Sequence, residues 1–117
     1  MDYRLLLNDL CRAVKGAHGA LMLDAGGEVV VGSDACDDRL RLIGAYQGIA
    51  LATAHRTAER YAGGSIGCLV ARHAAGTVIS RPLKDGYYLV IALAPEASVA
   101  LAEYRSTQVC ELLNAEI

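Results

Sequence analysis

The chain has 117 residues, a formal charge of −2 at neutral pH and a pI near 5.8, and 54% of its residues are apolar. Thirteen acidic residues outnumber eleven basic ones, which argues against nucleic acid and anionic membranes as partners because both select a basic patch. No apolar run approaches the ~20 residues that cross a bilayer, and charges occupy the N-terminal segment where a signal peptide is apolar, so we expect the protein in the cytosol. The length of 117 residues fits one domain over residues 1–117.

The first third of the chain predicts a helix followed by a β-hairpin. In residues 3–15 apolar side chains recur every three or four positions, as on one face of a helix, and Gly16 is placed to end it. An apolar segment at 17–23 and a β-branched segment at 28–31 flank Gly26–Gly27, a pair that suits a hairpin turn. We therefore expect two neighbouring antiparallel strands after a short helix.

The stretch from Asp37 to Ala62 predicts a long helix with two apolar faces. Ser33, Asp34 or Asp37 is positioned to cap its start, and Gly63–Gly64 is expected to end it. The sector expected to cover a sheet contains Leu40, Ile43, Gln47, Ala50, Leu51, Ala54, Ala58 and Tyr61. The roughly opposite sector contains Leu42, Tyr46, Ile49 and Thr53. A helix that packs only on its own sheet needs one apolar stripe, so the second stripe predicts contact with another chain.

Two glycines interrupt this helix. Each of Gly44 and Gly48 costs about 1 kcal/mol relative to alanine in a helix interior, so a close approach must compensate. Either another chain's backbone approaches them, or the helix lies unusually close to its own sheet. Because the helix also carries a second apolar stripe, we favour the first explanation, self-association.

The remaining elements are three strands and a helix. Residues 66–71, 77–83 and 87–93 read as strands separated by short turns, a three-stranded meander. Pro95 with Glu96 is expected to open a final helix that runs nearly to the C-terminus.

The predicted fold is α+β, with the element order α-β-β-α-β-β-β-α. Hairpins and a meander need only short turns, so the strands fit a five-stranded antiparallel sheet. Helices must cover both faces to bury strands as apolar as 87–93. We expect the long helix on one face and the N- and C-terminal helices on the other.

The sequence lacks the motifs of common catalytic and cofactor sites. No G-x-x-x-x-G-K-[ST] loop or G-x-G-x-x-G pattern occurs, and both glycine pairs read as turn or helix-end residues. Cys36 or Ser65 acting with a histidine is the remaining route to nucleophilic catalysis. The acidic residues at 24, 34, 37 and 38 are interpreted as turn and cap residues. We predict no catalytic residue, no cofactor and no enzymatic activity.

The cysteines and histidines do not have metal-binding spacing. The four cysteines are far apart, form no C-x-x-C pair and are expected to be reduced thiols: Cys11, Cys36, Cys68 and Cys110. The three histidines fall on three different predicted elements: His18, His55 and His73. We therefore predict no metal site.

Several strings recur in a characteristic order along the chain. They are Leu7-Asn8-Asp9-Leu10, Val14-Lys15-Gly16, Gly19-Ala20-Leu21-Met22-Leu23-Asp24 with Gly26-Gly27, the alanine-rich long helix, Val78-Ile79-Ser80-Arg81-Pro82-Leu83, and Lys84-Asp85-Gly86-Tyr87-Tyr88-Leu89-Val90-Ile91. Together with the element order, these strings resemble the roadblock family of dynein-light-chain-related proteins, especially its small bacterial and archaeal members. The resemblance covers essentially the whole chain and implies a roadblock/profilin-like fold. Nine arginines against two lysines also suggest a GC-rich bacterial genome.

The resemblance implies a homodimer in which the two long helices pair antiparallel and an edge strand of each sheet pairs with its mate. We place that strand at Ser65 to Arg72, because an exposed apolar edge is an aggregation liability. The predicted interface consists of Leu42, Gly44, Tyr46, Gly48, Ile49, Ala52, Ile66, Cys68 and Val70.

The resemblance also implies a regulator or adaptor of a Ras-like small GTPase, without an enzymatic activity of its own. The residues selected for contact with the GTPase are Arg41, Arg56 and Arg60. A scaffold with no effect on GTP turnover is the alternative. A small-molecule sensor or enzyme with a cavity between sheet and helix is a third hypothesis.

Overall fold

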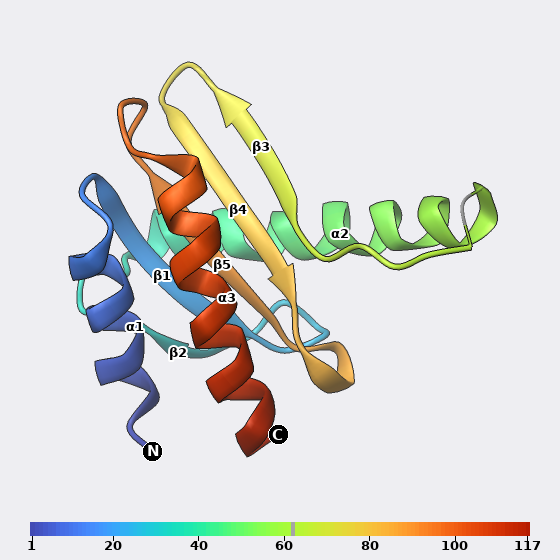
Figure 1. The fold of residues 1–117 in the computed structure, drawn as a ribbon, viewed down its shortest axis with the longest axis horizontal. Coiled ribbons are helices and arrows are strands. Elements are labelled where there is room, and N and C mark those ends of the chain that lie inside the picture. The colour runs from blue at the N-terminus through green and yellow to red at the C-terminus, as the bar shows by residue number, and fades with distance from the viewer. Residues whose placement is uncertain (62) are drawn as a thin grey trace.

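The computed structural model describes residues 1–61 and 63–117, and its elements follow the predicted order. They are α1 (Tyr3–Ala13), β1 (Ala17–Leu23), β2 (Val29–Gly32), α2 (Asp38–Tyr61), β3 (Leu69–His73), β4 (Gly76–Pro82), the 3-10 turn η1 (Lys84–Gly86), β5 (Tyr88–Leu93) and α3 (Val99–Glu116). The sheet lies between two helical layers, with α2 on one face and α1 and α3 on the other (Figure 1). This confirms the predicted α+β class and the assignment of helices to faces.

The five strands form one antiparallel sheet in the order β2-β1-β5-β4-β3. The last strand therefore lies in the centre beside the first, and β2 and β3 are the two edges. The predicted self-pairing segment thus contains an edge strand, although β3 begins at Leu69 rather than at Ile66. Residues 66–68 precede the strand.

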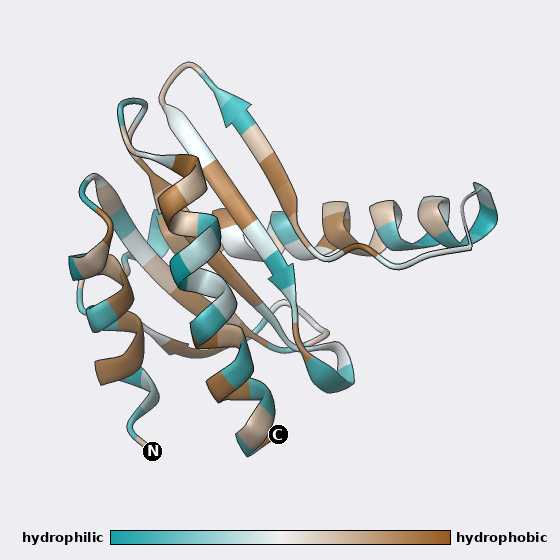
Figure 2. Cartoon of the chain, in the orientation of Figure 1, coloured by the Kyte–Doolittle hydropathy of each residue, from teal (hydrophilic) through white to brown (hydrophobic). Residues whose placement is uncertain are grey.

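Each face of the sheet carries its own apolar core. Leu7, Leu10 and Leu113 of α1 and α3 pack with Ile79 and Ile91 of the sheet. On the other face Leu40 and Leu51 of α2 pack against a second set of strand residues, Leu21, Leu23, Val78 and Val90. Figure 2 shows apolar residues along the strands between the helical layers. The alternation of strand side chains between faces allows one sheet to bury both cores.

Several element boundaries differ from the prediction. The last helix begins at Val99, not at Pro95, because Ser98 caps it by accepting a hydrogen bond from the Leu101 N–H at 3.1 Å. Pro95 lies in the turn before it. α1 ends at Ala13 rather than at residue 15. The predicted end of the long helix at Ala62 lies outside the described residues.

Asp37 caps the start of α2. Its carboxylate accepts a hydrogen bond from the Leu40 N–H at 2.8 Å, which satisfies one of the free amides of the first turn. Of the three capping residues suggested by the sequence, the structure therefore selects Asp37.

The C-terminal part of α2 extends past the β3 edge of the sheet (Figure 1). Tyr61 was predicted to cover the sheet, but its side chain is 85% exposed. The periodic pattern gave the direction of this side chain on the helix, whereas the sheet of the same chain ends before reaching it. The prediction that Tyr61 packs on its own sheet is wrong.

The two glycines of α2 face the chain's own sheet. A Cβ atom on Gly44 would lie 2.9 Å from Leu21 Cδ1, and a Cβ atom on Gly48 would lie 2.3 Å from Tyr88 Oη. The missing side chains therefore leave room for Leu21, Leu23 and Tyr88. Packing of the helix on its own sheet therefore accounts for both glycines, which corrects the favoured explanation by a second chain. The assignment of Gly44 and Gly48 to the dimer interface stays a prediction.

Replacing Gly48 by alanine tests this packing. Helix propensity alone favours alanine by about 1 kcal/mol, but the new methyl group overlaps Tyr88 Oη. We expect Gly48→Ala to lower the free energy of unfolding by about 1–3 kcal/mol, measured by denaturant titration. Gly64→Ala is the control, because a Cβ atom there would meet no atom of the described residues within 4 Å apart from its chain neighbours. Equal or greater stability of Gly48→Ala would contradict the assignment.

Candidate interaction surface

α2 presents apolar side chains to solvent. Leu42, Tyr46 and Ile49 are 59%, 64% and 65% exposed, and their spacing of four and three residues places them on one side of the helix. Together with Ala45 and Ala52 they form what we term the apolar face of α2. Contiguous exposed apolar residues on a folded protein mark a contact surface, and the sequence predicted this stripe.

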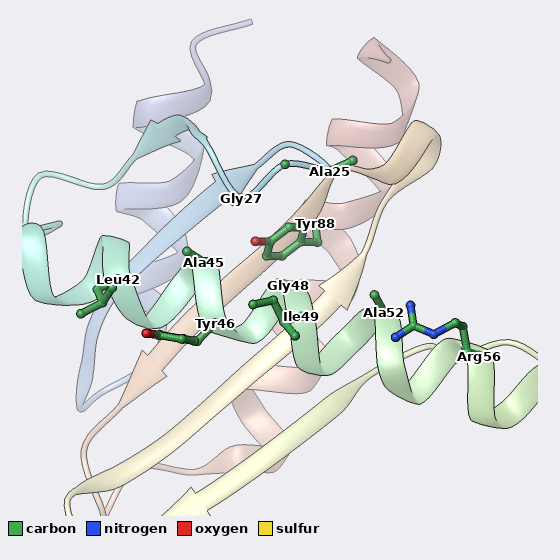
Figure 3. Close-up of a pocket in the computed structure, with 11 residues that line it drawn as sticks. Ala25, Gly27, Leu42, Ala45, Tyr46, Gly48, Ile49, Ala52, Arg56 and Tyr88 are labelled. Carbon is green, nitrogen blue, oxygen red and sulfur yellow. The ribbon is translucent and has the colours of Figure 1, made fainter.

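A cavity of about 390 Å³ lies between α2 and the β1–β2 turn. Figure 3 shows Ala45 and Ala52 on the side of α2 nearer to Ala25 and Gly27, with the ring of Tyr88 between them and the turn. Tyr46 projects farther from this turn, about 100° round the helix from Ala45, and so lies at the far border of the same face. The lining residues are Ala25, Gly26, Gly27, Leu42, Ala45, Tyr46, Gly48, Ile49, Ala52, Arg56 and Tyr88. The cavity is therefore mostly apolar and continuous with the apolar face of α2.

The turn that borders this cavity is held by Asp24. Its Oδ1 accepts hydrogen bonds from the Gly26 N–H at 2.9 Å and the Glu28 N–H at 3.0 Å. Gly27 has φ of +83°, a conformation that glycine adopts at little cost. The interpretation of Asp24 as a turn residue is confirmed.

Tyr88 connects the central strand β5 to α2. Its hydroxyl is buried and donates a hydrogen bond to the Gly44 carbonyl at 2.9 Å. Burial raises the pKa of Tyr88, and the nearby Asp24 carboxylate raises it further. The phenol is therefore neutral at physiological pH and acts here as a hydrogen-bond donor.

The edge strand β3 is the second candidate contact. Val70 is 36% exposed, and the segment before the strand is held to α2 by a hydrogen bond from the Ile66 N–H to His55 Nδ1 at 3.3 Å. Ile66 and Cys68 are partly buried within the described chain. An edge strand leaves backbone groups without a neighbouring strand and is a template for pairing.

The predicted site residues fall into two groups. Leu42, Tyr46, Ile49 and Ala52 come together on the apolar face of α2, and Ile66, Cys68 and Val70 lie at or next to the β3 edge. The sequence analysis missed Ala45, Gly27 and Tyr88, which line the cavity. The contact between β5 and α2 joins residues 44 positions apart, so no local pattern could reveal it.

The three selected arginines are all exposed but do not form one cluster. Arg56 and Arg60 border a shallow depression at the C-terminal end of α2, together with Thr53, Thr57 and Tyr61. Arg56 also donates a hydrogen bond to Thr53 Oγ1 at 3.3 Å. Arg41 lies near the start of the helix, where its guanidinium offsets part of the effect of burial, which raises the pKa of the Cys36 thiol. The arrangement gives two separated cationic positions beside the apolar face.

The cysteines do not assemble a reactive centre in the described residues. Burial is the main cause that raises the thiol pKa of Cys36, Cys68 and Cys110, so all three are protonated at neutral pH and poor nucleophiles. Cys68 Sγ lies 3.7 Å from Glu103 Oε1. The described residues contain no group of three or more potential metal ligands.

No helix within residues 1–61 and 63–117 combines the length and apolar character that a bilayer crossing requires.

Comparison with solved structures identifies the fold. A roadblock/LC7 domain from Streptomyces avermitilis superposes with a TM-score of 0.90 at 17% identity, covering 99% of this chain and 98% of that one. A structure described as MglB with tetrameric arrangement gives 0.86 at 16% identity, covering 97% and 85%. Profilin IB from Acanthamoeba castellanii gives 0.65 at 16% identity, covering 98% of each chain.

This chain has the roadblock fold, and the profilin-like part of the expectation is also confirmed. No protein-family model matches the sequence, and no curated protein matches it. At these identities the likeness concerns the fold alone.

The hydrogen bond of Tyr88 predicts a pH dependence of stability. Its pKa is higher in the folded chain than the ordinary value of 10.0, so the stabilisation is present below pH 10 and is lost as the pH rises through the folded pKa. We expect Tyr88→Phe to lower the free energy of unfolding by about 1 kcal/mol at pH 7–8, with a smaller difference above about pH 10. Denaturant titrations between pH 7 and 11 measure both, and a constant difference over that range would contradict this role.

Proposed function

We propose that this chain is a homodimeric, non-enzymatic regulator or adaptor that binds a Ras-like small GTPase in the cytosol. The observation that carries the proposal is the occurrence, on a roadblock fold, of an exposed apolar face on α2 together with a free β3 edge. The family resemblance in the sequence supports the same function. The tetrameric arrangement of the similar MglB structure is consistent with self-association.

The proposed dimer has a two-fold axis normal to the sheet, just outside β3. This axis pairs the two β3 strands antiparallel and places the two α2 helices side by side in opposite directions. Tyr46 and Ile49 lie on the exposed surface of α2 and supply apolar contact area there. A single isologous contact then covers both the strand edge and part of the apolar face.

The GTPase is proposed to bind across the paired α2 helices. Arg41, Arg56 and Arg60 are exposed and flank the apolar face, which suits a partner surface with acidic residues around an apolar centre. Binding one switch conformation of the GTPase more tightly than another shifts its population by the difference in affinity. Regulation by this route requires no catalytic group from the present chain.

The dimer is tested by placing a charge on the apolar face. Tyr46→Asp introduces a carboxylate into the proposed contact, and we expect the dissociation constant of the dimer to rise about tenfold or more. Sedimentation velocity over a dilution series measures it. Thr107→Asp, at an exposed position of α3, is the control. A dimer that is unchanged in Tyr46→Asp would exclude this face from the interface.

GTP turnover tests the partner. Small GTPases encoded in genes adjacent to this one are assayed with and without the purified chain. We expect binding, together with a change in turnover or nucleotide affinity, and a loss of about tenfold in affinity for Arg56→Glu/Arg60→Glu. Arg105→Glu on α3 is the matched control. Binding without any change in turnover or nucleotide affinity would indicate a scaffold. An affinity for the GTPase that is unchanged in Arg56→Glu/Arg60→Glu would reject the role of these two arginines.

A further inference from the structure

A second cavity, of about 370 Å³, opens between the first turns of α2 and the end of the sheet at the β3–β4 turn. Leu40, Ile43 and Val78 supply apolar walls. The polar side chains at the cavity are His18, Asp37, Arg39, His73 and Thr77. A side chain with an apolar body and a polar tip matches this lining.

Tyr61 has that chemistry and is largely exposed among the described residues. Its side chain is 85% exposed, the highest value among the large apolar side chains of the described residues. It lies on the part of α2 that extends beyond β3 (Figure 1). A tyrosine presented so far into solvent is typical of an interface residue.

Two hydrogen bonds locate the point where the β3 edge crosses α2. Ser80 of β4 donates to Gln47 Oε1 at 2.9 Å, and the Ile66 N–H, before β3, donates to His55 Nδ1 at 3.3 Å. The edge therefore crosses α2 between these positions, near residue 51. Tyr61 lies about ten residues, or about 15 Å along the helix, after this crossing point. A two-fold axis at the crossing point places it beside the residue of the other protomer that lies about ten positions before the crossing. The partner's Tyr61 then lies beside residues 39–43.

The direction of the side chain agrees with this position. Ile43 and Tyr61 are 18 residues apart in α2, which is five turns at about 3.6 residues per turn, so both project from the same side of the helix. Ile43 packs against the core between α2 and the sheet. An axis normal to the sheet leaves this sheetward direction unchanged, so in the proposed dimer the partner's Tyr61 also points toward the α2 face of the sheet. Ile43 lines the cavity, so the partner's Tyr61 is directed into it.

We propose that Tyr61 of each protomer inserts into the cavity of the other protomer, with its ring on Leu40 and Ile43 and its hydroxyl among His18, His73 and Arg39. This rests on the proposed homodimer and adds the residue that the partner contributes. The protruding end of α2 is then a reciprocal anchor, and each cavity is complete only in the dimer.

Truncation of the ring tests the anchor. We expect Tyr61→Ala to raise the dimer dissociation constant about tenfold or more, and Tyr61→Phe, which keeps the ring, to raise it much less. Tyr104→Ala removes a tyrosine that is 61% exposed on α3 and is the matched control. Circular dichroism checks that each variant is folded. A dimer affinity that is the same in Tyr61→Ala and Tyr104→Ala would overturn the proposal.

A photo-crosslinker at position 61 tests the location of the anchor. The probe is p-benzoylphenylalanine in place of Tyr61, followed by mass spectrometry of the crosslinked dimer. We expect intermolecular crosslinks to residues 37–43 or 73–78. Crosslinks elsewhere in a chain that dimerises would overturn the placement of Tyr61 while leaving the homodimer intact. A chain that stays monomeric at every concentration would instead reject the homodimer itself.

Discussion

The close approach of α2 to the sheet determines the rest of the architecture. The Tyr88 hydroxyl, carried by the central strand β5, reaches the Gly44 carbonyl and occupies the space next to Gly48. A larger residue at Gly48 would separate helix and sheet, and a displaced helix would no longer cover Leu21, Leu23 and Val90. This contact fixes which sides of α2 are buried, and therefore which side is offered to a partner.

Three of the exposed features of the molecule lie in one region. The apolar face of α2, the free edge of β3 and the helix end that carries Tyr61 all belong to the α2–β3 part of the fold, whereas α1 and α3 close the other face of the sheet (Figure 1). An apolar surface and an open strand edge each carry an aggregation hazard. Their concentration in one region favours a single symmetric contact that covers both.

The features that follow from local periodicity, such as the apolar stripes of a helix, were predicted from the sequence. The features that depend on contacts between distant segments were not. Leu42, Tyr46 and Ile49 were recognised as a second stripe because helical spacing is visible in the chain. Close packing on the chain's own sheet was the less favoured of two explanations for Gly48, because its contact, Tyr88, lies 40 positions away in sequence. Tyr61 was assigned to the sheet because periodicity gives the direction of a side chain, not the extent of the sheet below it. Pro95 was assigned to the last helix, although Ser98 supplies the better cap.

The open edge of β3 has a consequence for the abundance of the protein. If association is what covers this strand, the folded chain gains stability by mass action, and its apparent melting temperature rises with its own concentration. Newly synthesised chains are then monomers with an uncovered strand edge until they dimerise, and as monomers they are open to aggregation and proteolysis. The rate of synthesis, and not the amino-acid sequence alone, would set the fraction of chains that reach the dimer.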